Sequence, residues 1–277
     1  EDRKAEGRLA LLRDAGSGAK PALEGRGWLV RLYARTNAAW WRRAQARVAG
    51  AADAVAVCSH LDRQRLGAPN AVVVPNGYTA PARPLGRVTV GRPPTLLLQG
   101  LLYYTPNTYG AVWLVGTVLP HLRRLQPEVR VRLVGAAKER VRALARPPEV
   151  EVTGRVPDMA PELARADVVV APVLYGGGTR IKILEAFAHR IPVVSTPVGI
   201  EGIDATDGIH LLVADDPREF AEACARLTFD EDLRARLADR AERLFLERYR
   251  WTHVRAGIAA LAHAVAGTQD RREQRRA

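Results

Sequence analysis

The chain has 277 residues, of which 47% are hydrophobic and 26% are charged, an ordinary globular composition. No apolar run is long enough to span a bilayer or to act as a signal peptide, which excludes a transmembrane helix. We therefore expect a soluble, cytoplasmic protein, or a piece of a longer one, because the chain begins with Glu1 and not with Met. The length allows one large domain or two smaller ones.

The formal net charge of +12 has four available explanations. A nucleic acid, an anionic membrane surface and an anionic substrate would each favour a basic chain. The fourth is genome composition, because nearly all of the positive charge is arginine. The arginines are spread over every segment, and no standard nucleic-acid-binding module is present, so we expect no nucleic-acid partner.

The N-terminal third predicts a helix rich in tryptophan and arginine over residues 27–48. Such a helix is typical of the interfacial region of an anionic membrane, although a helix that packs its Trp face on its own domain fits the pattern better. Short apolar runs at 54–58 and 72–74, with a helical stretch at 61–66 between them, predict the last units of an α/β domain ending at Gly77. Residues 78–94, rich in Pro and Gly, predict a linker.

Beyond the linker, apolar runs alternate with helical segments, which predicts a parallel, doubly wound sheet. In such a sheet, ligands bind at the carboxyl ends of the strands. Asp216, followed by Pro217, predicts a firmly capped helix. The expected strands are 95–98, 129–134, 150–152, 168–173 and 192–195.

Two further helices are expected over 230–245 and 251–266, followed by a disordered basic tail at 267–277. The two cysteines, Cys58 and Cys224, have no metal-ligand spacing. We interpret both as buried thiols.

The segment 175–199, YGGGTRIKILEAFAHRIPVVSTPVG, is the most informative part of the chain. It predicts a strand followed by a glycine loop and a helix, and free N–H groups at such a helix N-terminus bind phosphate. Arg180 and Lys182 lie in the first turn, where the helix dipole disfavours a cation unless an anion is bound. The alternative is a tight turn in which Lys182 forms a surface ion pair with Glu185. The spacing fits neither the P-loop nor the dinucleotide fingerprint.

The run GGGTRIKILEAFAHRIPVVSTPVGIEG resembles the signature of the C-terminal domain of family 4 glycosyltransferases, whose architecture of two Rossmann-like domains is called GT-B. The resemblance extends from about Ala51 to Trp251. It implies an α/β fold of GT-B type. The expected domains are a partial N-terminal domain at 1–77, a complete nucleotide-sugar-binding domain with a parallel sheet at 95–250, and a crossover helix at 251–266. The other matching segments, in order, are AADAVAVCSHLDRQRL, VVVPNGY, LLLQGLLYYTPN, VRLVG, VEVTGRVPD and ADVVVAPVLYGGGTR.

The resemblance also implies roles for particular residues. The glycine loop and the first helical turn would grip the donor's diphosphate, and Glu185 would bind the ribose hydroxyls. Arg180, Lys182 and Glu185 are the expected catalytic residues. The expected donor-binding residues are Gly176, Gly177, Gly178, Thr179, Gly100 and Asn107.

Two departures from the family pattern concern the donor site. Many members have a first glutamate, assigned to the transferred sugar, where this chain has Gly177, so the sugar contact must differ or come from backbone amides. Near Gly100, many relatives carry an Arg and a Lys that hold the phosphates, whereas this chain reads GLLYYTPNTYG. Arg180 and Lys182 would replace that charge, as expected for a subgroup with a Gly-Gly-Gly-Thr-Arg loop.

The implied activity is transfer of a sugar from a nucleotide-diphosphate sugar to an acceptor hydroxyl, with retention of configuration. The donor is then a substrate, and neither a metal nor a cofactor is expected. By the same resemblance, the acceptor would be a sugar or a lipid-linked sugar in cell-envelope or exopolysaccharide synthesis. A cytoplasmic enzyme peripheral to the inner face of the membrane would suit such work.

The N-terminal domain looks truncated, because a nucleotide-binding domain needs on the order of 100–150 residues. In GT-B enzymes that domain supplies much of the acceptor site and often a histidine. The histidines in this chain are weak candidates for that role, because each lacks an expected acidic partner. A catalytically inactive nucleotide-binding remnant and a nucleotide-sugar epimerase of the same architecture therefore remain alternatives. The histidines considered are His60, His121, His189 and His210.

Overall fold

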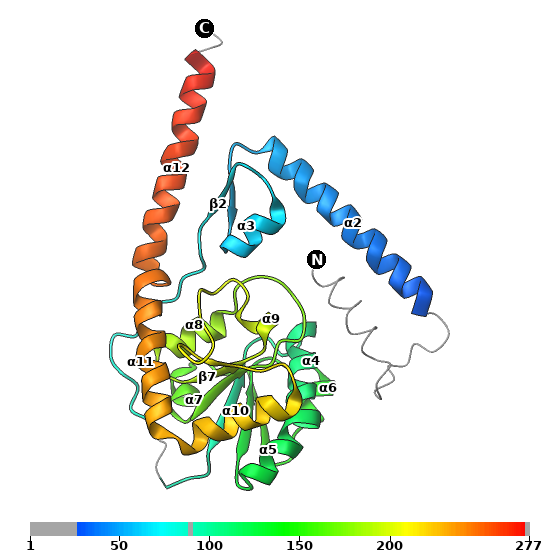
Figure 1. Ribbon diagram of the computed structural model, residues 1–277, viewed down its shortest axis with the longest axis vertical. Helices are drawn as coiled ribbons and strands as arrows, with labels where there is room; N and C mark the ends of the chain where they lie inside the picture. The colour runs from blue at the N-terminus through cyan, green and yellow to red at the C-terminus, as the bar shows by residue number, and fades with distance from the viewer. Residues whose placement is uncertain (1–26, 88–90, 275–277) are drawn as a thin grey trace. The chain divides into compact units, whose positions relative to one another are not determined.

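The computed structural model describes residues 27–87 and 91–274 (Figure 1). The chain divides into two compact units. The first consists of Glu1–Pro75, Tyr175–Thr179 and Arg255–Ala277, and the second of Asn76–Leu174 and Arg180–Val254. The first segment of the first unit ends at Pro75, two residues before Gly77, where the sequence analysis places the end of the first domain.

The first unit holds a small parallel pair of strands joined by a helix. β1 (Val55–Val57) pairs with β2 (Ala71–Val73), and α3 (His60–Leu66) connects them. The side chain of Ser59 accepts a hydrogen bond from the Asp62 N–H at 3.0 Å and caps α3. The long α2 (Gly27–Ala51) precedes this pair, and most of α12 (Trp251–Gln274) belongs to the same unit.

The second unit contains the predicted parallel sheet, which is confirmed. Its strand order is β5-β4-β3-β6-β7-β8, and every neighbouring pair is parallel. The short last strand was not predicted. The strands are β3 (Thr95–Gln99), β4 (Arg130–Val134), β5 (Val150–Gly154), β6 (Val168–Ala171), β7 (Val193–Ser195) and β8 (Leu212–Val213).

Helices cover both faces of this sheet (Figure 1). Side chains alternate between the faces of a strand, so Leu96 and Leu98 of β3 lie in one hydrophobic core and Leu97 lies in the other. The first core includes side chains of α4, η2, α5 and α10, and the second includes side chains of α8 and α11. The helices are α4 (Thr105–Trp113), the π-helix η2 (Leu114–Val118), α5 (Leu119–Leu125), α6 (Glu139–Arg142), α7 (Ala160–Ala164), α8 (Ile181–Ala188), α9 (Pro197–Ile200), α10 (Pro217–Phe229) and α11 (Glu231–Arg248).

The predicted cap of α10 is confirmed. The carboxylate of Asp216 accepts hydrogen bonds from the N–H groups of Arg218 at 2.8 Å and Glu219 at 3.3 Å. Asp230 caps α11 in the same way through the Leu233 N–H. These caps satisfy backbone donors that the helices themselves leave without a partner.

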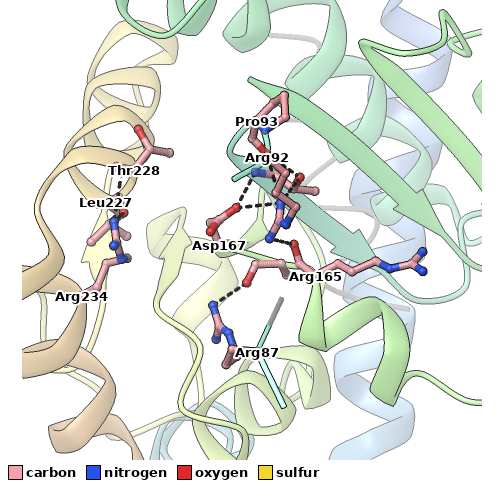
Figure 2. A network of polar contacts seen from close by, with 10 residues as sticks. Arg87, Arg92, Pro93, Arg165, Asp167, Leu227, Thr228 and Arg234 are labelled. Carbon is pink, nitrogen blue, oxygen red and sulfur yellow. Dashed lines mark hydrogen bonds and ion pairs between the residues drawn. The ribbon is translucent and has the colours of Figure 1, made fainter. Parts of the chain in front are cut away.

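The predicted linker packs on the second unit and is not a free connection. Its side chains Tyr78, Ala80 and Leu85 lie against the second core, and Arg87 donates to the carbonyl of Ala166 at 2.7 Å. Figure 2 shows the polar network at the amino ends of β3 and β6, where Arg92 pairs with Asp167 at 3.2 Å. The described part of the linker therefore has defined contacts although it forms no helix.

The C-terminal end of the chain differs from the sequence-based expectation. The tail predicted to be disordered from residue 267 is helical as far as Gln274, because α12 continues to that residue. The reason is local: the arginine, glutamate and glutamine residues of this segment are good helix formers, and no proline interrupts it. Residues 275–277 lie outside the described residues.

The two thiols also differ from each other. Cys224 is buried in α10, as expected. Cys58, after β1, is only partly buried, contrary to the prediction, because the small two-stranded sheet covers it incompletely. Within the described residues, neither cysteine is in a disulfide bond.

We predict that Gly135→Ala destabilises the second unit strongly. Gly135 follows β4 with φ 135°, and an added Cβ would lie 1.8 Å from the carbonyl oxygen of Gly100. The backbone would have to move, at a cost of about 2–4 kcal/mol in the free energy of unfolding. Urea denaturation followed by circular dichroism measures this cost.

Gly116→Ala is the matched control for that measurement. Gly116 lies in η2, and nothing stands within 4 Å of an added Cβ. Its free energy of unfolding should change by less than about 1 kcal/mol. Equal stabilities of the two variants would contradict the close approach of the loops after β3 and β4.

Candidate functional site: a cationic pocket at the carboxyl end of the sheet

The candidate site lies where the sheet reverses its strand order. β3 and β6 are neighbours in the middle of the sheet, and the chain leaves them in opposite directions, through β4 on one side and β7 on the other. In open α/β sheets, ligands bind at the carboxyl ends of the strands at such a point. Gln99 is the last residue of β3, and Gly100 follows it. The segment after β6 leads to α8.

α8 begins without a side-chain cap. Arg180 is its N-cap residue and makes no side-chain capping hydrogen bond. The first N–H groups of a helix have no partner within the helix, and the positive end of the helix dipole lies beside them. The N-terminus of α8 is therefore suited to an anion.

Lys182 is a buried cation in the first turn of α8. Its side chain is 9% exposed, and its ammonium donates a hydrogen bond to Oδ1 of Asn107 at 3.1 Å. Burial, followed by repulsion from Arg180, lowers the pKa of Lys182 to about 7. The surface ion pair with Glu185, considered as the alternative, is not formed, since that carboxylate has other partners.

Gly100 and Asn107 bring the loop after β3 against this lysine. A Cβ added to Gly100 would lie 3.7 Å from Nζ of Lys182 and 3.5 Å from Nδ2 of Asn107. Nδ2 of Asn107 also donates to the carbonyl of Leu101 at 3.0 Å, which fixes the amide with its oxygen toward Lys182. A neutral amide orients the ammonium without cancelling its charge, so the charge stays available for a ligand.

Glu185, one turn further along α8, has a donor on each carboxylate oxygen. Tyr78 Oη donates to Oε1 at 2.8 Å, and Nε2 of Gln99 donates to Oε2 at 2.5 Å. Burial raises the pKa of Glu185, and the hydrogen bonds from Tyr78 and Gln99 oppose that rise. A carboxylate held in this way is an acceptor for hydroxyl groups.

The structure brings together four of the predicted site residues near the carboxyl end of β3, Gly100, Asn107, Lys182 and Glu185, all in the second unit. Arg180 adjoins them at the start of α8. The remaining residues, Gly176, Gly177, Gly178 and Thr179, belong to the first unit. Gly176 and Gly178 have φ values of 123° and 82°, which favour glycine over any other residue. The functional roles of all these residues stay predictions.

None of the four histidines gains a partner typical of a catalytic base. His60 is exposed, His121 is partly buried, and Nδ1 of His210 accepts from the Thr206 N–H at 3.0 Å. His189 lies at the C-terminal end of α8, where burial lowers its pKa. Within residues 27–87 and 91–274, no group of three or more His, Cys, Asp or Glu side chains could hold a metal ion. No helix in this part of the chain is long and apolar enough to cross a membrane.

The sequence analysis missed Tyr78 and Gln99. They contact Glu185 from positions 107 and 86 residues away in the chain. Gln99 carried one usable signal, a polar residue at the end of the apolar run TLLL. Tyr78 carried none, because its role depends on how the linker packs.

Comparisons with known proteins give the relatives of this chain. Residues 93–230 match the family described as glycosyl transferases group 1. A Klebsiella pneumoniae protein, described as an uncharacterized 44.6 kDa protein in the cps region, is 26% identical over 136 residues. That alignment covers 46% of this chain and 35% of the relative.

Two solved structures share the fold. HepE of Anabaena, in complex with UDP and glucose, has a TM-score of 0.60 at 17% identity, covering 76% of this chain and 63% of its own. Sucrose-phosphate synthase of Thermosynechococcus elongatus has a TM-score of 0.68 at 17% identity, covering 94% and 66%. The chain thus spans about a third of the curated relative and less than two thirds of each solved chain. Residues 93–230 thus resemble the group 1 glycosyltransferases, and the two solved structures share the fold.

Proposed function

We propose that this chain is the donor-binding part of a family 4 glycosyltransferase with a Gly-Gly-Gly-Thr-Arg loop. It moves a sugar from a nucleotide-diphosphate sugar to an acceptor hydroxyl, with retention of configuration. The buried ammonium of Lys182 carries the proposal, because it lies next to Gly100 at the start of an uncapped helix. A buried cation of this kind is more stable beside a bound anion than without one.

The chemistry follows from the charges around that pocket. The bond between the sugar and the diphosphate breaks, and negative charge develops on the departing diphosphate. Lys182, Arg180 and the N-terminus of α8 stabilise this charge, and Glu185 holds the ribose. Lys182, Arg180 and the N-terminus of α8 supply the positive charge without a metal or a cofactor. Since Gly177 has no side chain, backbone amides would contact the transferred sugar.

The donor and the pathway are proposed from the relatives. UDP occupies HepE, so uridine diphosphate is the first donor product to test. The relative in the cps region supports a role in making a cell-envelope or exopolysaccharide precursor, with a sugar or lipid-linked acceptor.

We predict that the chain binds UDP or GDP and that Lys182→Met weakens this binding by about tenfold or more, because a charged hydrogen bond to the diphosphate is lost. Binding of uridine or guanosine, which lack phosphates, should not change in the same variant. Glu185→Gln should weaken binding of the diphosphates and of the nucleosides by a similar factor, since Glu185 is assigned to the ribose. Isothermal titration calorimetry measures all of these affinities.

Arg123→Met is the control for removing a positive charge. Arg123 is exposed near the end of α5 and pairs with Glu149, next to the amino end of β5. Its loss should leave nucleotide binding unchanged. If the wild-type chain binds neither diphosphate, the proposed function is wrong.

A nucleotide-binding protein without transferase activity is the second candidate. The observation in its favour is Gly177, which stands where relatives have the glutamate assigned to the sugar. The two candidates differ in whether the bond to the sugar breaks. Release of UDP from UDP-glucose or of GDP from GDP-mannose by the chain would decide for the enzyme.

We further propose that α2 contacts an anionic membrane surface. In its described part, Trp40 is 59% exposed, and the neighbouring arginines Arg42, Arg43 and Arg47 are exposed too. The side chains of residues 27–35 lie outside the described set, so the Trp28 part of the expected pattern stays a prediction.

Replacing the three arginines by glutamine should weaken binding to phosphatidylglycerol vesicles by more than about tenfold, since each charge near the surface contributes about 1 kcal/mol. Cosedimentation measures the bound fraction. Pure phosphatidylcholine vesicles are the control, and they should bind the wild type and the variant equally weakly. Equal binding of both proteins to the anionic vesicles would exclude this role for α2.

A further inference from the structure

Tyr78 stands at a fixed point of the second unit. Its backbone N–H donates to the carbonyl of Tyr249 at 2.8 Å, and its own carbonyl accepts from the Trp251 N–H at 3.3 Å. Gly77 before it packs closely on Trp251, because an added Cβ would lie 3.0 Å from the indole ring. The backbone of Tyr78 is therefore tied to the segment between α11 and α12.

The side chain of Tyr78 is oriented by two aromatic neighbours. Its ring makes edge contacts with Phe245, at a centroid distance of 6.4 Å, and with His189, at 6.2 Å. This packing directs the phenol toward α8, where the hydroxyl donates to Oε1 of Glu185. Burial and the hydrogen bond to Glu185 raise the pKa of Tyr78, so the phenol stays protonated and remains a donor.

Gln99 donates a hydrogen bond to the other carboxylate oxygen of Glu185. The side chain is 2% exposed at the end of β3, and its amide nitrogen donates to Oε2. Its own oxygen Oε1 is buried without a hydrogen-bond partner among the described residues. A buried acceptor of this kind is destabilising unless a donor reaches it, such as a hydroxyl of a bound ligand.

The remaining capacity of Glu185 fits a pair of hydroxyls. A carboxylate has two oxygens with about four lone-pair positions in all. Tyr78 and Gln99 each use one of these positions, on different oxygens. Each oxygen keeps a position for one more donor, and a ribose presents two adjacent hydroxyl donors.

We propose that Tyr78 and Gln99 are positioning residues, which hold the carboxylate of Glu185 as a two-oxygen acceptor for the 2′ and 3′ hydroxyls of the donor's ribose. This inference rests on the proposed function and adds to it the residues that determine recognition of ribose. Tyr78 and Gln99 act through Glu185 and not on the reacting atoms.

The surrounding charges give the proposal a pH signature. Burial raises the pKa of Glu185, and the two donated hydrogen bonds lower it. The other titratable groups nearby are Lys182, one turn before Glu185 on α8, and His189 at the end of that helix. Asp158 contributes to the raised pKa of Tyr78 and opposes the lowering of the His189 pKa by burial. When Glu185 becomes protonated it loses acceptor capacity, so nucleotide binding weakens as pH falls through the pKa of Glu185. Removal of one hydrogen bond raises that pKa further and moves the loss of binding to higher pH.

The test is Tyr78→Phe in the full chain, which removes one hydroxyl and keeps the ring. Calorimetry compares UDP and GDP with their 2′,3′-dideoxy forms. The wild type should prefer the ribose form on the order of tenfold or more, because two hydroxyl hydrogen bonds are lost in the dideoxy form. In Tyr78→Phe this preference should fall several-fold, and the acid limb of the binding profile should move to higher pH.

Tyr249→Phe is the matched control. Tyr249 is a buried tyrosine of the same unit, and its hydroxyl accepts from the Asp204 N–H at 2.8 Å, away from Glu185. It should keep both the ribose preference and the acid limb of the wild type. Gln99→Met serves as a second variant if Tyr78→Phe does not fold, and it should show the same two changes.

The outcomes separate this inference from the function on which it rests. If the wild type binds no nucleotide, the proposed function fails and this inference fails with it. If the wild type prefers ribose and Tyr78→Phe keeps both that preference and the acid limb, only the inference is overturned. A variant that weakens ribose and dideoxy forms by the same factor has lost general structure, and that result also overturns it.

Discussion

The candidate site depends on one buried positive charge. Lys182 lies below the surface at the start of α8, and the partner of its ammonium is the neutral amide of Asn107. Burial of a charge without an opposite charge is costly, and the pKa of about 7 expresses that cost. A diphosphate that enters the pocket would remove the cost. The unpaired charge of Lys182 thus destabilises the chain without a ligand, and a bound donor would remove this destabilisation.

The rest of the second unit holds this charge in place. The strand order reverses between β3 and β6, which is where ligands bind in open α/β sheets, and the helices that follow these strands pack on opposite faces. Gly100 and Gly135 allow the loops after β3 and β4 to approach each other closely. At the other end of the sheet, Arg92, Asp167 and Arg87 fasten the linker. The amino end of the sheet therefore provides stability, while the carboxyl end provides the site.

Much of this arrangement was predictable from local signals. The alternation of apolar runs and helices predicted the parallel sheet, and Asp216 predicted a helix start; both are confirmed. The anion site that the glycine loop and Lys182 indicate stays a prediction. The partners of those residues were not predictable in the same way. Tyr78 and Gln99 reach Glu185 across most of the chain, and periodicity contains no information about contacts at that separation. The short strand β8 escaped for another reason, because two residues are too few to form a pattern.

The burial of Lys182 also could not be read from the sequence. A lysine near the start of a helix is exposed in most proteins, and a pair with Glu185 was a reasonable expectation. The loop after β3 changes that outcome, since it covers the lysine and offers it only an amide. The same loop lacks the Arg and Lys of many relatives, and we propose that Arg180 and Lys182 at the start of α8 supply that charge instead.

The central claim is that the ammonium of Lys182 is restored when a diphosphate binds. At pH 8 the terminal phosphate of UDP or GDP is already ionised. The free chain holds Lys182 mostly neutral, so binding should take up close to one proton, about as many as the shifted pKa implies. Calorimetry in two phosphate-free buffers of different ionisation enthalpy measures this number. Uptake by the wild type that disappears in Lys182→Met is the predicted result, and binding without proton uptake, or equal uptake in the variant, would contradict the account.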